Sequence, residues 1–262
     1  MKLKLYQINA FTSQVFRGNP AAVLPLDEWL DDSTMQAIAT ENNLSETAFF
    51  VPKGNGYHLR WFTPTQEVPF CGHATLASSF VIFNILGTSN PAITFETLSG
   101  VLTVRKDGDL FVMNFPKMEY VFCEAPPHLL DGLGKKPSEI FRVDADPNYY
   151  AVYDDEEDVR SMKPDLRTLE QLHPYGVVIT AASKTVDIVS RCFAPSYGIP
   201  EDPVTGSIHS ALVPYWSARL GKAKLHAEQA SKRGGQLFCE NTQDGVVVAG
   251  HGAKFMEGEI EF

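Results

Sequence analysis

Short segments along most of the chain alternate between apolar and polar residues. Such alternation places successive side chains on opposite faces, as in a half-buried β-strand. In the first half the pattern predicts strands at Lys4–Phe11, Ala22–Leu24, Ala48–Pro52, Tyr57–Phe62, Ile93–Thr97, Gly100–Lys106 and Leu110–Phe115. In the second half it predicts strands at Tyr149–Tyr153, Gly176–Thr180, Asp187–Phe193, Gln236–Glu240 and Val246–Gly250. Both halves are therefore expected to be rich in strands.

A helical period occurs in fewer places. It predicts an amphipathic helix over Asp32–Asn43, with Ser33 as its N-cap and Met35, Ile38 and Ala39 facing inward. A second short helix is predicted near residues 165–173. Residues 116–150 are rich in Pro and Gly and are expected to connect the two halves. The acidic run at 154–158 is interpreted as a solvated loop.

One pattern occurs twice. Residues 69–78 read Pro-Phe-Cys-Gly-His-Ala-Thr-Leu-Ala-Ser, and residues 203–212 read Pro-Val-Thr-Gly-Ser-Ile-His-Ser-Ala-Leu, with Gly206 lying 134 positions after Gly72. Each copy predicts a helix, one over residues 72–86 and one over 206–220, followed by a glycine that suits a left-handed C-terminal position, Gly87 or Gly221. Pro214 lies inside the second helix and is expected to kink or shorten it.

The duplication predicts two equivalent helix N-termini in two similar halves. Unpaired backbone N–H groups and the positive end of the helix dipole make such a terminus a natural site for an anion. Two of them facing each other could bind one small anionic ligand. A small carboxylate-bearing substrate is therefore the expected partner.

Composition excludes several other classes of partner. The 262 residues carry a formal charge of −10 without a clustered basic face, which argues against nucleic acid. No apolar run reaches the roughly 20 residues of a membrane-spanning helix, so no membrane association is expected. The four cysteines are scattered, without a CxxC pair, and no signal peptide is recognisable. A cytoplasmic protein without disulfides is the expectation.

Candidate chemistry in the first half centres on three residues. Glu46 follows the first helix and opens an apolar strand, where a carboxylate suits general acid or base work. A solvated or salt-bridged Glu is the alternative. Cys71 and His73 flank Gly72, and either a buried Cys with a capping His or a reactive pair fits this spacing. No second ligand pair stands at a usable spacing, so no metal site is predicted.

In the second half Asp202 precedes the second glycine and could orient a ligand, although an Asp before Pro also forms turns. Ser207 could bond a ligand or complete the helix cap. Thr205 is the counterpart of Cys71, and its hydroxyl is too weak an acid to be a matched base at neutral pH. A symmetrical exchange of protons between two thiols is therefore not available to this chain.

Several of these residues lie in segments that together resemble the phenazine-biosynthesis-protein-F-like (PhzF) family, which has the diaminopimelate epimerase fold. The segments are residues 16–23 (Phe-Arg-Gly-Asn-Pro-Ala-Ala-Val), 44–49 (Leu-Ser-Glu-Thr-Ala-Phe), 60–64 (Arg-Trp-Phe-Thr-Pro), 67–76 (Glu-Val-Pro-Phe-Cys-Gly-His-Ala-Thr-Leu) and 202–207 (Asp-Pro-Val-Thr-Gly-Ser). They occur in the family's order. The similarity is weakest around residues 116–175.

The resemblance implies an α+β fold with two pseudo-symmetric lobes, each a curled mixed β-sheet around a central helix, and an active site in the cleft between the lobes. The lobes would comprise residues 1–117 and 118–262, with the return of the C-terminal strand to the first lobe left open. It also implies that no cofactor and no metal take part. A homodimer is a further expectation, because the family frequently forms dimers.

The resemblance further implies residue roles. Glu46 would move a proton during isomerisation, with His73 and Asp202 as supporting donors or acceptors. The residues expected to bind the substrate are Asn19, Cys71, Gly72, Thr205, Gly206 and Ser207. The predicted activity is a cofactor-independent isomerisation of a small carboxylate. An epimerase using Cys71 and Glu46, and a silent relative that binds a metabolite or a protein, remain the alternatives.

Overall fold

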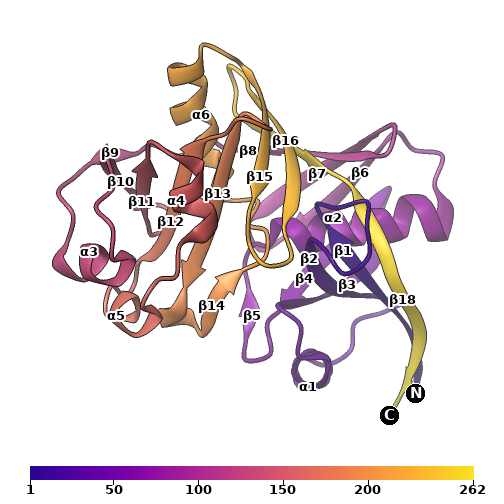
Figure 1. Ribbon diagram of the computed structural model, residues 1–262. Coiled ribbons are helices and arrows are strands. Elements are labelled where there is room, and N and C mark those ends of the chain that lie inside the picture. The colour runs from indigo at the N-terminus through magenta and orange to yellow at the C-terminus, as the bar shows by residue number, and fades with distance from the viewer. The chain divides into compact units, whose positions relative to one another are not determined.

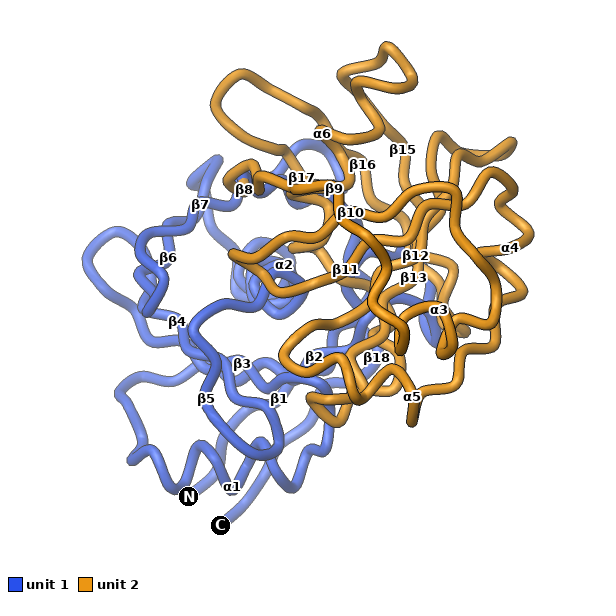
Figure 2. Tube along the Cα trace, turned by 90° about the vertical axis from the view of Figure 1, so that its left-hand side faces the viewer, with its two compact units in different colours: residues 1–114, 249–262 blue, residues 115–248 orange.

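The computed structural model describes all 262 residues and divides into two compact units (Figures 1 and 2). The first unit comprises Met1–Asn114 and Ala249–Phe262, and the second comprises Phe115–Val248. The C-terminal strand β18 (Gly252–Glu261) pairs antiparallel with β1 (Lys2–Ala10) along its whole length. The two ends of the chain therefore lie side by side in the first unit.

The first unit contains a mixed sheet. β1 pairs antiparallel with β2 (Asn19–Pro25), which pairs parallel with β3 (Glu46–Lys53). β3 pairs antiparallel with β4 (Gly56–Phe62). β4 in turn pairs antiparallel with the short β5 (Glu67–Val68) and parallel with β6 (Ala92–Thr97). The hairpin partners β7 (Gly100–Asp107) and β8 (Leu110–Phe115) follow β6.

The central helix of this unit is α2 (Gly72–Val81), which continues as a π-helical segment, Ile82–Gly87. It packs against β1, β2 and β3. Its small hydroxyl residues stay buried because Thr75, Ser78 and Ser79 each donate to the carbonyl four residues earlier. The predicted end at Gly87 is confirmed, since this glycine has a φ of 79°.

A second helix, α1 (Asp32–Asn42), covers another face of the sheet and buries Met35, Ile38 and Ala39, as predicted. The predicted cap is wrong. Asp31 rather than Ser33 is the N-cap, because its carboxylate accepts the Thr34 N–H at 2.9 Å and the Thr34 hydroxyl at 2.7 Å.

The second unit is built around another mixed sheet. β9 (Val121–Phe122), β10 (Glu139–Val143) and β11 (Asn148–Tyr153) pair antiparallel in that order, and β11 pairs parallel with β12 (Gly176–Ala182). β13 (Ile188–Ala194) joins β12 antiparallel, adds β14 (Ile199–Asp202), and pairs parallel with β15 (Lys224–Gln229). β16 (Gly235–Asn241) follows β15, and β17 (Val246–Gly250) ends near the unit boundary. A 3₁₀ turn, Pro195–Tyr197, connects β13 and β14.

Three short helices, α3 (Pro127–Leu133), α4 (Glu156–Ser161) and α5 (Leu166–Glu170), supply Leu133, Val159 and Leu169 to a core with strand residues such as Ile179 and Val189. The longer α6 (His209–Leu220) contributes Trp216, whose indole N–H donates to the Thr180 hydroxyl of β12 at 3.0 Å.

The start of α6 differs from the sequence prediction. Residues 206–208 form a tighter turn, in which the N–H groups of His209 and Ser210 bond three residues back, to Gly206 and Ser207. The regular helix therefore begins three residues after Gly206. Its end at Gly221, with a φ of 64°, is as predicted.

Pro214 does not end the helix. Its missing N–H leaves the Ser210 carbonyl without a helical partner, and the backbone N–H of Met118 donates to that carbonyl at 3.1 Å. A neighbouring chain segment therefore replaces the hydrogen bond that proline removes.

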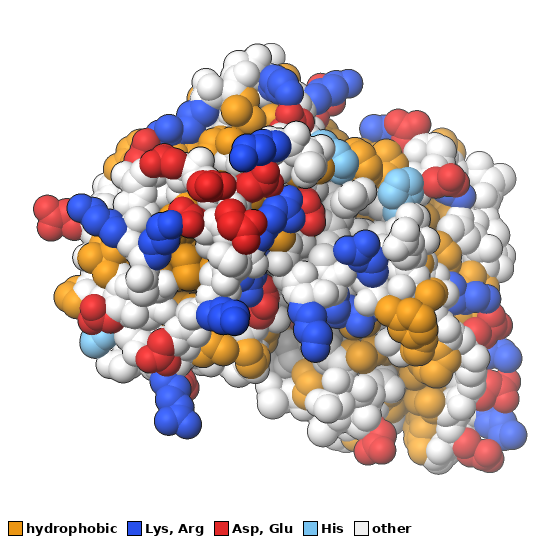
Figure 3. Space-filling model, in the orientation of Figure 1, with side chains coloured by type: hydrophobic (Ala, Val, Ile, Leu, Met, Phe, Trp, Pro, Cys, Tyr) orange, Lys and Arg blue, Asp and Glu red, His pale blue; other side chains and the backbone are white.

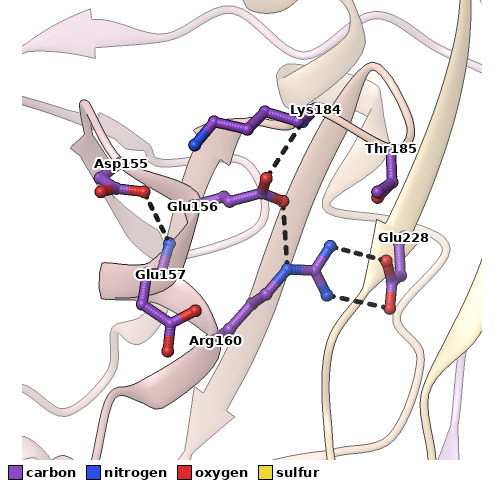
Figure 4. A pocket seen from close by; sticks show the side chains of 7 residues that line it. All are labelled: Asp155, Glu156, Glu157, Arg160, Lys184, Thr185 and Glu228. Atoms are coloured by element: carbon purple, nitrogen blue, oxygen red, sulfur yellow. Dashed lines mark hydrogen bonds and ion pairs between the residues drawn. The ribbon is translucent and has the colours of Figure 1, made fainter.

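The interpretation of residues 154–158 as a loop is wrong, because α4 begins at Glu156 (Figure 4). Asp155 caps the helix through the Glu157 N–H, and acidic side chains in a first turn are favoured by the helix dipole. Arg160 holds Glu156 at 3.1 Å and Glu228 of β15 at 2.8 Å. On the face drawn in Figure 3, basic and acidic side chains are interspersed over this unit.

None of the helices combines the length and the apolar composition that crossing a membrane requires.

Candidate active site

In the first unit, three elements meet at one polar group. Asn19 is the first residue of β2, Glu46 the first residue of β3, and Cys71 and His73 stand at the start of α2. Because β2 and β3 are parallel, with Ala21 opposite Glu46, their first residues lie at the same edge of the sheet. Gly72, the first residue of the helix, is buried between Cys71 and His73.

The contacts within this group are short. His73 Nε2 lies 3.1 Å from Glu46 Oε2, an ion-pair distance without the alignment of a hydrogen bond. On the other side of the ring, His73 Nδ1 lies 3.5 Å from Cys71 Sγ and 3.3 Å from Asn19 Nδ2. The His73 and Glu46 side chains are only 8% and 14% exposed. The imidazole therefore joins the thiol to the carboxylate.

Burial and neighbouring charges shift the pKa values of His73 and Cys71. Burial by itself lowers the pKa of His73, but the neighbouring Cys71 and Glu46 more than offset this and raise the pKa well above its ordinary value of 6.5. Burial, with the charge of Glu46, raises the pKa of the Cys71 thiol. We conclude that the Cys71 thiol is neutral and that Glu46 favours protonation of His73.

Glu46, Cys71 and His73 are also residue types that can bind a metal ion. Their ligand atoms lie within 4.8 Å of one another. Glu46 and Cys71, however, contact opposite nitrogens of His73, and one metal ion would bind only one of those nitrogens. The raised pKa of Cys71 also disfavours the thiolate that a metal needs. The arrangement fits proton transfer better than metal binding.

The start of α2 leaves backbone donors for a ligand. Helices α1, α4 and α5 are each capped by an aspartate, Asp31, Asp155 or Asp165. In α2 the N-cap is Cys71, whose side chain makes no capping hydrogen bond. The first N–H groups of this helix are therefore not satisfied by a cap, as an anion-binding terminus requires.

In the second unit, Asp202 ends β14 and is followed by the segment that carries Thr205, Gly206 and Ser207. The Thr205 hydroxyl donates to Asp202 Oδ2. Since Gly206 and Ser207 lie in the turn before α6, their backbone does not form the regular helix terminus that the sequence predicted.

Two further residues hold this segment, and the sequence analysis missed both. Gln229, at the end of β15, bonds Asp202 and Thr205, and the Ser231 hydroxyl donates to the Pro203 carbonyl at 2.7 Å. Neither residue belongs to a motif, and β15 was itself not predicted because its sequence is largely polar. The alternation of Leu225 and Ala227 with polar residues could have indicated the strand, but nothing local marks the side chains of Gln229 and Ser231.

Asp146, in the turn between β10 and β11, was also missed. Burial raises the pKa of its carboxyl group, and the Ser207 hydroxyl lowers it by a smaller amount. His209 is fully buried, and its Nδ1 lies 3.0 Å from the Thr205 carbonyl oxygen. Burial lowers the pKa of His209 to about 4, so it is neutral and donates to that carbonyl.

The predicted site residues thus fall into two groups, one in each unit. Asn19, Glu46, Cys71, Gly72 and His73 come together in the first unit, and Asp202, Thr205, Gly206 and Ser207 in the second.

The fold is that of racemases and epimerases. A probable proline racemase of Agrobacterium radiobacter, solved with bound carbonate, superposes with a TM-score of 0.64, with 99% of this chain and 93% of that chain covered. Its 13% sequence identity supports similarity of fold alone. The likeness therefore places this chain in the fold that the racemase has.

Sequence comparison identifies the family. Residues 8–258 match the family described as phenazine biosynthesis-like protein. An uncharacterised isomerase of Pseudomonas aeruginosa is 47% identical over 260 residues, which cover 99% of each chain. The crystal structure of a PhzF-family protein of Enterococcus faecalis has a TM-score of 0.96 and 42% identity over 100% of each chain. The chain therefore belongs to the phenazine biosynthesis-like (PhzF) family, as the sequence motifs predicted.

Proposed function

We propose that this protein is a cofactor-independent isomerase that moves a proton within a small carboxylate-bearing metabolite, with Glu46 as the base. The observation that carries the proposal is the buried pair of Glu46 and His73, 3.1 Å apart at the uncapped start of α2. A carboxylate at this position can take a proton from a ligand bound at the start of the helix.

In the proposed reaction, Glu46 removes a proton from a carbon activated by an adjacent carbonyl or double bond. The electron pair left on that carbon moves into the unsaturated system, and the double bond shifts. Glu46 then delivers a proton to a second carbon, so that the substrate and product have the same composition, and because a carboxyl proton exchanges with water the delivered hydrogen can come from the solvent. Because one carboxylate takes and returns the proton, both carbons react on the same face of the substrate.

The start of α2 would bind the substrate carboxylate. Its uncapped N–H groups can hold the negative charge and stabilise the charge that develops as the proton leaves. Gly72 permits this close approach because it has no side chain. Asn19, Cys71 and His73 would orient the substrate, and Asp202 with Ser207 would support the reaction as donors or acceptors.

An epimerase that uses Cys71 and Glu46 as two bases is less well supported. Two bases that act on opposite faces of one carbon must each lie about 3–3.5 Å from it, and thus roughly 6–7 Å from each other. The ligand atoms of Cys71, His73 and Glu46 all lie within 4.8 Å of one another. The raised pKa of Cys71 also leaves little thiolate at neutral pH.

The proposed function is tested by proton NMR of a panel of carboxylic metabolites in deuterium oxide, with wild-type enzyme and the Glu46→Gln variant. We expect a proton at an activated carbon to exchange with wild type, and the exchange rate to fall about 10³-fold in the variant, within the range for loss of a general base. The exchanging carbon identifies the class of substrate.

The matched control is Glu41→Gln, which alters an exposed glutamate of α1. Exchange that survives in Glu46→Gln would move the role of base to another residue. Binding without exchange across the panel would favour a metabolite-binding protein. A requirement for an added cofactor would contradict the proposal, and the expected homodimer and cytoplasmic location remain predictions from the family resemblance and the composition.

A further inference from the structure

Gln229 uses its amide oxygen and both of its amide hydrogens to bond one segment of the second unit. The side chain is fully buried at the end of β15. Its Oε1 accepts the Thr205 N–H at 2.8 Å, and its Nε2 donates to the Asp202 carbonyl at 2.8 Å and to Thr205 Oγ1 at 3.2 Å. A buried amide with an acceptor and both donors in use is held in a single orientation.

The orientation of this amide follows from its partners. A backbone N–H can only donate, so Thr205 N requires the oxygen of Gln229, and a carbonyl can only accept, so Asp202 requires the nitrogen. The nitrogen then also donates to Thr205 Oγ1. The hydroxyl proton of Thr205 consequently points away from Gln229 and toward Asp202 Oδ2, to which it donates.

We propose that Gln229 is a positioning residue that sets the orientation of the Asp202 carboxylate through the Thr205 hydroxyl. The proposal rests on the supporting role given to Asp202 in the proposed function. The proposal also gives a role to Thr205, at the position equivalent to Cys71. Its hydroxyl accepts a hydrogen bond from Gln229 and donates one to Asp202, which a non-polar side chain of the same shape could not do.

The strand pairing keeps Gln229 in place. It lies opposite Ser190 of β13 in the parallel ladder and opposite Gly235 of β16 in the antiparallel one. The amide therefore extends from a strand paired on both sides, and it reaches a segment, residues 203–208, that has no strand or helix of its own. Rigid support of a functional loop by an adjacent strand is how precise side-chain orientation is obtained.

The experiment compares four variants with wild type. Gln229→Glu keeps the shape but removes both amide donors, and Thr205→Val keeps the shape but removes the hydroxyl. Thr205→Ser retains the hydroxyl and should rescue the function. Gln236→Leu is the control, because Gln236 is an exposed glutamine on the neighbouring strand β16.

The first measurement does not depend on turnover. In protein labelled with ¹³C at aspartate, the carboxyl resonance of Asp202 should move in Gln229→Glu and in Thr205→Val, and should stay in place in Thr205→Ser and Gln236→Leu. An unmoved resonance in Gln229→Glu, with the protein folded, would overturn the proposal whether or not a substrate is known.

The second measurement uses the substrate found by deuterium exchange. We expect kcat to fall about tenfold in Gln229→Glu and in Thr205→Val, the effect of one lost buried hydrogen bond, with KM changed less. The double variant should be no worse than Gln229→Glu alone, because both changes break the same chain of hydrogen bonds. If the fold losses in kcat of the two single variants multiply in the double variant, the two changes act independently, and the positioning proposal is contradicted. If wild type catalyses no exchange, the proposed function fails while the resonance still tests the positioning.

Discussion

The two units have the same order of strand pairing but different chemistry. Each unit contains four consecutive strands, β1–β2–β3–β4 in the first and β10–β11–β12–β13 in the second. The first and second strands of each series pair antiparallel, the second and third parallel, and the third and fourth antiparallel. In each, the fourth strand of this series carries a short antiparallel partner and, after the central helix, a parallel one. The duplicated pattern in the sequence therefore marks a duplicated scaffold.

An arginine clamp lies at equivalent places in both units. Arg60 of β4 holds Glu67 of β5 through two hydrogen bonds of 2.7 Å, and its guanidinium lies 5.2 Å from the ring centre of Phe62. Arg191 of β13 holds Glu201 of β14 at 2.7 and 3.1 Å and lies 4.9 Å from the Phe193 ring. Both clamps hold the short strand that precedes the glycine of the duplicated pattern, Gly72 at the start of α2 or Gly206 just before α6.

The two units differ most at the position of the proposed base, Glu46. Glu46 is the first residue of β3, whereas the first residue of the equivalent strand, β12, is Gly176. A side chain there would place its Cβ about 2.4 Å from Asn148 Oδ1, which no real contact allows. A carboxylate at this position would therefore require the buried Asn148 side chain to move. The difference teaches that the scaffold is shared while the acid–base group is built in one unit.

The largest expected effect separates Glu46 from Cys71. If one carboxylate moves the proton, Glu46→Gln lowers the exchange rate about 10³-fold, whereas Cys71→Ser lowers it less than tenfold because the thiol is not the base. Both rates come from deuterium exchange followed by NMR. Equal losses in the two variants, with inversion at one stereocentre, would support the two-base epimerase instead.

The two buried histidines should make the stability of the fold depend on pH in opposite directions. The folded pKa of His209 is about 4, below the unfolded value of 6.5, so the unfolded chain binds the proton first and stability falls as the pH drops from 6.5 to 4. At about 1.4 kcal/mol per pH unit, the loss amounts to about 3 kcal/mol. Urea unfolding at several pH values should show a smaller acid loss in His209→Gln than in wild type. The exposed His128, changed to Gln, serves as control, and an unchanged pH dependence in His209→Gln would refute the assignment.

For His73 the sign is reversed. Its folded pKa lies above 6.5, so its protonation stabilises the fold fully below pH 6.5, and this contribution is lost as the pH rises through the folded pKa. The same urea series, extended to alkaline pH, should show a flatter decline for His73→Gln than for wild type. A steeper decline in the variant would mean that His73 is neutral in the folded protein.

The smallest effects concern the clamps. Lysine cannot make both hydrogen bonds of an arginine, so Arg60→Lys should cost about 1 kcal/mol of unfolding free energy. Arg191→Lys should cost about 2 kcal/mol, because Arg191 also donates to the carbonyls of Val159 and Met162, whereas the further partner of Arg60, Asp32, is exposed. Urea unfolding measures both, with the exposed Arg105→Lys as control. A larger loss for Arg60→Lys would show that the clamps are not equivalent.

The sequence determined the strands, the duplication and the family. Alternating residues predicted strands such as β4 and β8, because each has a face that packs against other parts of its own unit. Gly87 and Gly221 marked the helix ends because their positive φ values are costly for other residues. The candidate residues Glu46, Cys71 and His73 were found because they lie in local motifs.

Only the tertiary structure decided how those residues meet. Nothing local predicts that His73 lies between Cys71 and Glu46, because the Glu46–His73 contact depends on how α2 packs against β3. The role of Gln229 gave no signal, since it depends on the pairing of β15 with β13 and β16. Local pattern specifies which residues form elements, and long-range packing and hydrogen bonding specify which side chains share a site.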